Sequence, residues 1–269
     1  MVTLLTAHGA EIEARTRSGQ TPLHYAAGYP YIYKFITSFR PYWQNSSIVE
    51  LLIAKGCNAN AKDNDGSTPL CYALEVGHTE AAKRLIAASA DRVVVKNEAG
   101  QTMLHDAFTS NNTELLQLLL DNGADTEEKD RDGNTLLHLA VRRDDRELCR
   151  LLFAHRAAAN VANRGGITPL HYAASEGRSD LVTFLLANDA NINAQDRAGN
   201  TALHGAALRD HREVVELFMA RGASLDIKNS RGRTPLAEAV RRGYKDIVRF
   251  LTTEAASPDA DVQDRRTTK

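Results

Sequence analysis

A short motif recurs seven times along the chain at a nearly constant spacing. It reads TPLHYAA in its clearest copies, and the copies begin at residues 21, 68, 102, 135, 168, 201 and 234. Successive starts lie 47, 34, 33, 33, 33 and 33 residues apart. A chain with this period is built as a row of similar small units, because each unit contacts mainly its neighbours.

The residues within one unit predict a helix-turn-helix. In the unit 163–195, Gly166 lies two residues before the motif threonine, where a turn needs a positive φ. Thr168 is a suitable N-cap, and the proline after it suits the first position of a helix. Gly177 ends this helix, and 180–187 carries leucine and valine at helical spacing. One such helix pair cannot bury its apolar face alone, so we expect an all-α stack of these units.

The period, the G-x-TPLHxAA motif, the glycine between the helices and the LL-x-x-GA-x-x-N ending resemble ankyrin repeats. This resemblance implies short β-hairpin turns, called fingers, between helix pairs. It also implies a solenoid whose fingers and first helices line a concave surface that binds other proteins. We expect the solenoid to occupy 1–254, as a half repeat 1–15 and repeats that start near 16, 63, 97, 130, 163, 196 and 229. A disordered tail is expected over 255–269.

Two departures from the pattern lie near the amino terminus. The half repeat 1–15 lacks a first helix, so it is either a small cap or the start of a fragment of a longer array. The first full repeat carries 14 extra residues within an insert, 29–46, which holds seven of the sixteen aromatic residues. They are Tyr29, Tyr31, Tyr33, Phe35, Phe39, Tyr42 and Trp43. These side chains either cover exposed core or form a second binding patch.

The sequence contains no recognisable catalytic or metal-binding motif. Cys57, Cys71 and Cys149 are widely spaced and form no CxxC pair, which argues against a structural zinc site or a disulfide scaffold and favours a reducing compartment. Phosphate-loop, dinucleotide, zinc-protease and serine-nucleophile motifs are absent. Five histidines share the fourth motif position, one repeat apart, too far to share a metal ion. They are His24, His105, His138, His171 and His204. We therefore expect them to be structural, with no metal, no cofactor and no enzyme activity.

The charged residues are balanced overall but uneven along the array. The chain has 33 Lys and Arg against 34 Asp and Glu, a net charge of −1, so any electrostatic recognition must be local. The resemblance implies that partners touch positions −6, −4, −3, −1, +7 and +8 relative to each motif threonine. From the fourth repeat onward these positions hold ten arginines, here called the arginine surface, against Asp132 and Glu176. The ten are Arg131, Arg142, Arg143, Arg164, Arg197, Arg209, Arg231, Arg233, Arg241 and Arg242.

Two interpretations of the arginine surface stay open at this stage. It is either a solvated face that keeps the protein soluble, or a binding site for carboxylates or phosphates, which the planar guanidinium suits. The resemblance also implies a modification site. Asn60, Asn160 and Asn193 lie eight residues before a motif threonine, the position that asparaginyl hydroxylases modify in ankyrin repeats.

The function expected from these features is a non-catalytic scaffold or adaptor. We expect it to be monomeric and cytoplasmic or nuclear, to bind a partner protein with an acidic or phosphorylated segment, and to have no small-molecule substrate and no membrane contact. One alternative is a regulatory or targeting module of a larger polypeptide. Another is binding of phosphorylated or nucleic-acid ligands by the arginine surface, although no aromatic residues alternate with the arginines to stack on bases.

Overall fold

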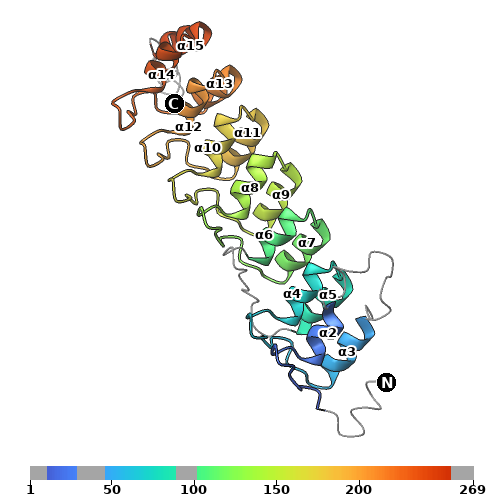
Figure 1. Cartoon of the computed structure of the whole chain (residues 1–269). Helices are drawn as coiled ribbons and strands as arrows, with labels where there is room; N and C mark the ends of the chain where they lie inside the picture. The colour runs from blue at the N-terminus through green and yellow to red at the C-terminus, as the bar shows by residue number, and fades with distance from the viewer. Residues whose placement is uncertain (1–10, 29–45, 89–101, 256–269) are drawn as a thin grey trace, which may run out of the picture. The chain divides into compact units, whose positions relative to one another are not determined.

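The computed structural model describes residues 11–28, 46–88 and 102–255. All helices within these residues are short, and they follow one another in pairs (Figure 1). The chain divides into two compact units, Met1–Ala124 and Asp125–Lys269, and each is considered by itself. Apart from Ser46, the aromatic insert lies outside the described residues, as do 1–10 of the half repeat and the tail from 256 onward.

The first unit contains three helix pairs among its described residues. Its helices are α2 (Pro22–Gly28), α3 (Ser46–Ala54), α4 (Pro69–Glu75), α5 (Thr79–Ala88), α6 (Met103–Thr109) and α7 (Thr113–Asp121). The first helices α2 and α4 pack against each other, and so do the second helices α3 and α5. Each first helix also packs on the second helix of its own pair.

The second unit repeats this arrangement four times. Its helices are α8 (Leu136–Arg143), α9 (Arg146–Ala154), α10 (Pro169–Ser175), α11 (Ser179–Ala187), α12 (Ala202–Leu208), α13 (Arg212–Ala220), α14 (Pro235–Arg242) and α15 (Lys245–Ala255). The first helices form one layer, in which α10 lies between α8 and α12, and α12 lies between α10 and α14. The second helices form the other layer, and the connecting loops project beside the first helices (Figure 1). The predicted all-α stack of helix-turn-helix units is therefore confirmed.

Small residues on the first helices allow this close packing. Ala173, Ala174, Ala206 and Ala207 are all fully buried between neighbouring helices. The second helices fill the space behind them with larger side chains such as Phe218, which is also fully buried. The apolar groups of one repeat are thus removed from water by the repeats on either side, which is the main source of stability in such an array.

Fingers precede the first helices and bond to one another through their backbones. In the second unit they comprise 129–134, 162–167, 195–200 and 228–233. The backbone N–H of Arg164 donates to the carbonyl of Asp132 at 3.0 Å, and that of Arg197 donates to the carbonyl of Gly165 at 2.9 Å. Gly166 has the predicted positive φ of 77°, and a Cβ there would lie 2.6 Å from the backbone nitrogen of Arg197. Glycine is therefore required for both the turn and the close approach.

The motif histidines join the helices of one repeat to the finger of the next. The backbone N–H of Thr168 donates to Nδ1 of His171 at 3.2 Å, so the proton of the neutral imidazole lies on Nε2. Nε2 lies 3.0 Å from the carbonyl oxygen of Asn200 and donates to it. His24, His138 and His204 make the same pair of contacts. The structural role expected for these histidines is confirmed at these four positions.

This geometry disfavours a protonated imidazole. Burial is the largest cause that lowers the pKa of His24, His138, His171 and His204, and it lowers the pKa of His138 to about 4. The backbone carbonyls that face Nε2 oppose this shift without cancelling it. Protonation of Nδ1 would also place a proton against the threonine N–H, so the folded protein keeps these side chains neutral.

We expect the free energy of unfolding to fall as the pH is lowered from 7 to 5. A lowered pKa in the folded state means that the unfolded chain takes up protons below pH 6.5 that the folded chain does not. For His138 this loss continues down to a pH of about 4. Each histidine contributes up to about 1.4 kcal/mol per pH unit to the slope of the free energy of unfolding against pH. Urea titrations at several pH values measure the slope, and His138→Gln should reduce it. A stability that is flat over this window would contradict the neutral state of these histidines in the folded protein.

The finger glycines provide a second test with a matched control. Gly166 and Gly232 both have positive φ, but a Cβ at Gly232 meets no described atom within 4 Å. Both Gly→Ala changes should cost about 1–2 kcal/mol for the left-handed conformation. Gly166→Ala should cost a further ~1–3 kcal/mol, because the new methyl group clashes with the next finger. Equal losses in urea titrations would show that the fingers do not need this close approach.

Candidate functional site

The arginine surface lies in the second unit, on the fingers and at the carboxyl ends of the first helices. The finger residues are Arg131, Arg164, Arg197, Arg231 and Arg233. The residues at the helix ends are Arg142, Arg143, Arg209, Arg241 and Arg242. Nine of these residues are exposed, and Arg233 is half-buried. The hydrogen bonds, ion pairs and ring contacts of the guanidinium groups differ. These contacts determine which of the groups are available to bind a partner.

Arg164 and Arg197 occupy the same place on two consecutive fingers. Their backbones are held by the finger-to-finger hydrogen bonds described above, while both side chains are exposed. Neither guanidinium makes a hydrogen bond or ion pair with another residue in the described part of the chain. The two side chains therefore present uncompensated positive charge from backbone positions that are well defined. Arg131 has the same position on the preceding finger and is also exposed.

Two further arginines are held loosely by neighbouring groups. The guanidinium carbon of Arg142 lies 5.4 Å from the centre of the Tyr172 ring, a cation–π contact between α8 and α10. Arg209 Nη1 lies 3.8 Å from Glu176 Oε1 and donates to the carbonyl of Ser175 at 3.3 Å. Both arginine side chains remain exposed, so these contacts position them and leave them accessible.

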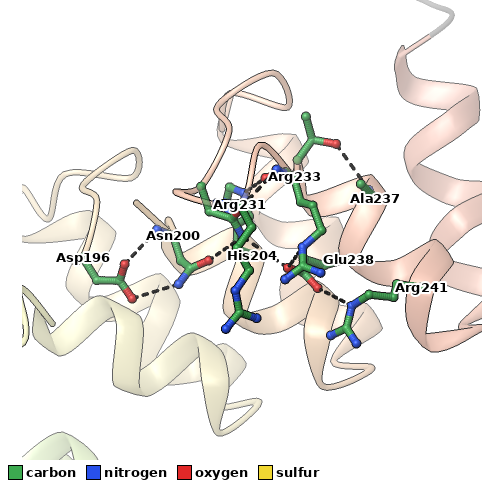
Figure 2. A network of polar contacts seen from close by, with 10 residues as sticks. Asp196, Asn200, His204, Arg231, Arg233, Ala237, Glu238 and Arg241 are labelled. Atoms are coloured by element: carbon green, nitrogen blue, oxygen red, sulfur yellow. Dashed lines mark hydrogen bonds and ion pairs between the residues drawn. The ribbon is translucent and has the colours of Figure 1, made fainter. Parts of the chain in front are cut away.

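Arg233 and Arg241 are instead paired with a buried carboxylate, Glu238, on α14 (Figure 2). Arg233 Nε lies 2.8 Å from Glu238 Oε1, and Arg241 Nε lies 3.1 Å from Glu238 Oε2. Asn229 Nδ2 also donates to Oε1 at 3.2 Å. The sequence alone did not reveal this pairing, because Glu238 lies at the fifth motif position, outside the positions compared there. Two of the ten arginines thus carry much less free charge than their exposure suggests.

Glu238 stays ionised at neutral pH. Burial by itself raises the pKa of this carboxyl group, but hydrogen bonds from Arg241 and Asn229 and the charge of Arg233 lower it by more. The net result is a pKa below the ordinary value for glutamate. The negative charge therefore persists, and it holds both arginines at physiological pH.

A line of amide and carboxylate side chains fixes the base of the last two fingers (Figure 2). Asp196 Oδ1 accepts from the backbone N–H of Asn200 at 2.8 Å, and Asn200 Nδ2 donates to Asp196 Oδ2 at 3.1 Å. Asn229 Nδ2 in turn donates to Asn200 Oδ1 at 2.9 Å, which joins one finger to the next. An Asp or Asn five residues before the motif threonine is the sequence signal for this feature. It fixes the backbone from which Arg197 and Arg231 project.

The predicted hydroxylation residues have partly structural surroundings. Asn160 Oδ1 accepts from the backbone N–H of Asn191 at 2.6 Å, and its Nδ2 donates to the carbonyl of Asp189 at 2.8 Å. Asn193 Oδ1 accepts from the backbone N–H of Ser224 at 2.9 Å. These two side chains tie each repeat to the next, and Asn60 is half-buried. Hydroxylation at the three positions stays a prediction.

The second predicted patch lies outside the described residues. It comprises Tyr31, Tyr33, Phe35, Phe39, Tyr42 and Trp43. Within the described ranges, no three His, Cys, Asp or Glu side chains gather in a way that would hold a metal ion. In the same ranges, no helix has the length and apolar character needed to cross a membrane.

Stacked helix pairs joined by bonded fingers define a helical repeat protein. A family model described as ankyrin repeats (3 copies) matches residues 41–130, 110–196 and 192–264, which is most of the chain. The chain belongs to the ankyrin repeat family. A comparison with curated proteins gave no match. Ankyrin repeats are generally protein–protein interaction modules.

Glu238→Gln should destabilise the protein more than the same change at an exposed partner. Removing the charge leaves Arg233 and Arg241 without a counter-ion, so we expect a loss of about 1–3 kcal/mol in the free energy of unfolding. The matched control is Glu176→Gln, whose exposed contact with Arg209 should contribute less than about 1 kcal/mol. Urea titrations at neutral pH compare the two variants. Equal losses would mean that Glu238 does not compensate the two arginines.

Proposed function

We propose that this protein is a non-catalytic adaptor or scaffold that binds an acidic or phosphorylated segment of a partner protein. The binding site is the arginine surface of the second unit. The observation that carries the proposal is the pair Arg164 and Arg197, whose exposed side chains have no hydrogen-bond or ion-pair partner among the described residues. A surface kept only for solubility needs no such matched pair of cations on consecutive bonded fingers.

Physical magnitudes support recognition of an extended acidic segment. Neighbouring repeats are spaced by roughly 10 Å, as packed helices are. Charges at this separation are largely screened at physiological salt, where the Debye length is about 8 Å, so the empty surface is not strongly strained. Each hydrogen bond to a carboxylate or phosphate contributes about 1.5–3 kcal/mol before the cost of ordering the segment is subtracted. Two or more such contacts are enough for reversible binding.

The internal pairing at the last repeat indicates where this surface is most basic. Glu238 offsets Arg233 and Arg241 on the last repeat, whereas Arg164 and Arg197 on the fingers 162–167 and 195–200 have no counter-ion among the described residues. Arg142 and Arg209 extend it along the first helices. We therefore place the centre of recognition at Arg164 and Arg197.

The three cysteines fit a reducing compartment. Cys57, Cys71 and Cys149 are free thiols, and Cys57 and Cys149 are buried. We accordingly propose that the protein is located in the cytoplasm or nucleus. We also propose that it acts as a monomer. The same surface can serve an independent adaptor or one module of a larger polypeptide.

The double substitution Arg164→Glu/Arg197→Glu should abolish binding of acidic peptides. The probes are a fluorescent poly-glutamate peptide, a serine-phosphorylated peptide and a single-stranded oligonucleotide, each measured by fluorescence anisotropy at low and high salt. We expect the wild type to bind the acidic or phosphorylated peptide, with an affinity that falls at least tenfold in the variant, or about 1.4 kcal/mol. The affinity should also fall with added salt.

A control variant separates the proposed site from net charge. Arg150→Glu/Arg212→Glu makes the same change in charge on the second helices α9 and α13, where Arg150 pairs with Glu147 and Arg212 with Glu216. It should leave peptide binding nearly unchanged. Equal losses in the two variants would reduce the effect to overall charge. Tight binding of the oligonucleotide alone would favour nucleic acid as the ligand.

A further inference from the structure

Gly205 lies in α12 at the fifth motif position, and no other copy of the motif has glycine there. The other six copies carry Tyr25, Tyr72, Asp106, Leu139, Tyr172 and Glu238. Glycine inside a helix is less favourable than alanine, because it loses more backbone freedom on folding. The presence of glycine at this helical position, where other repeats have a larger side chain, therefore calls for a structural or functional explanation.

Neither backbone conformation nor packing provides that reason. Gly205 is absent from the glycines with positive φ, and α12 is regular at this residue. A Cβ built on Gly205 would have its nearest contact with Ser175 Cβ at 3.5 Å, an ordinary van der Waals distance. This differs from Gly166, where a Cβ would come within 2.6 Å of backbone. The fold would accept alanine at 205, and α12 would be more stable with it, because alanine has a higher helix propensity than glycine.

Side chains on both neighbouring first helices occupy the equivalent position. The hydroxyl of Tyr172 on α10 accepts from Asn163 Nδ2 at 3.2 Å, and Glu238 on α14 accepts from Asn229 Nδ2. Both side chains thus reach from the helix to the base of their own finger. In the repeat of Gly205 the corresponding finger residue, Asp196, bonds to Asn200 instead. At position 205 itself, α12 has no side chain that could reach the base of the finger 195–200.

The residue nearest to this position is also small. The hydroxyl of Ser175 donates to the carbonyl of Tyr172 at 3.2 Å, so the side chain turns back onto its own helix. In the preceding repeat the residue equivalent to Ser175 is Arg142, which covers the Tyr172 ring. Between the repeats of Tyr172 and Gly205, both members of such a pair are replaced by small residues.

We infer that Gly205 receives an aromatic side chain of the acidic partner segment and so determines specificity within the arginine surface. This inference rests on the proposed function. Three other repeats carry tyrosine at this position, so a ring of that size suits the space above a first helix. Arg197 and Arg209 of the same repeat are exposed and can lie against the ring as Arg142 lies against Tyr172. The favoured partner segment has an aromatic residue flanked by acidic residues.

The test compares two fluorescent nine-residue peptides of glutamate, one with a central tyrosine and one with a central alanine. The wild type should bind the tyrosine peptide about tenfold more tightly than the alanine peptide. Gly205→Tyr introduces the tyrosine that three other repeats carry at this position. It should abolish the difference in affinity between the two peptides, while both peptides still bind. Arg164→Glu/Arg197→Glu should weaken binding of both peptides, and of the tyrosine peptide at least as much as the alanine peptide, because Arg197 also contacts the ring.

The outcomes separate this inference from the proposed function. If both peptides bind the wild type equally through the arginines, or if the tyrosine preference survives in Gly205→Tyr, the inference fails and the proposed function stands. If neither peptide binds the wild type, the inference fails. If the serine-phosphorylated peptide also fails to bind, or if the arginine substitutions change nothing, the proposed function fails as well.

A stability measurement tests the premise without a ligand. Because packing does not require the glycine, Gly205→Ala should raise the thermal unfolding midpoint, whereas Gly166→Ala should lower it. A lower midpoint for Gly205→Ala would show that the fold itself needs glycine at 205, and the inference would be overturned. Circular dichroism of Gly205→Tyr checks that its helices are intact.

Discussion

The hydrogen bond from a motif histidine to the finger carbonyl of the next repeat connects the two structural parts of each unit. One imidazole accepts from the amide that begins a first helix and donates to the following finger. The helix layer and the row of fingers are thereby held in a common register. The arginine surface depends on this register, because it combines finger residues with residues at the ends of the first helices. A neutral imidazole is needed for both bonds, so protonation of these histidines would disturb the register.

The sequence was sufficient to predict features that depend on one repeat at a time. The period, the turn glycine Gly166 and the N-cap threonines follow from local backbone chemistry, and the helix pairs follow from apolar spacing. The sequence did not predict the Glu238 pairing or the line through Asp196, Asn200 and Asn229. The line joins side chains of different repeats, and the number of residues between them does not show which atoms meet. The Glu238 pairing was missed because the sequence comparison was limited to other motif positions. The substitution of one residue at the fifth position there changes the role of two arginines.

A neighbouring buried carboxylate, more than the exposure of the arginine itself, determines what each arginine can do. Arg241 and Arg164 are both exposed arginines of the same surface, yet Arg241 lies beside a buried carboxylate and Arg164 has no counter-ion among the described residues. A buried charge must be compensated within the protein, and Glu238 with its partners meets this requirement at the last repeat. On the fingers 162–167 and 195–200 no carboxylate pairs with Arg164 or Arg197 among the described residues, since Asp196 accepts hydrogen bonds from Asn200 instead. The guanidinium groups of these two arginines are therefore available for interactions outside the protein. Counting charges along a sequence cannot make this distinction.

The bonds between fingers have a consequence for how such an array can evolve. The N–H of Arg164 meets Asp132, that of Arg197 meets Gly165, and that of Ser230 meets Ala198, so each bond joins equivalent or adjacent positions of successive repeats. A duplicated or deleted repeat would find the same donors and acceptors on both sides and would need no new contact. Whole repeats can therefore be exchanged at little cost to folding. Residues that differ from repeat to repeat, such as Gly205 and Glu238, give a repeat an individual surface.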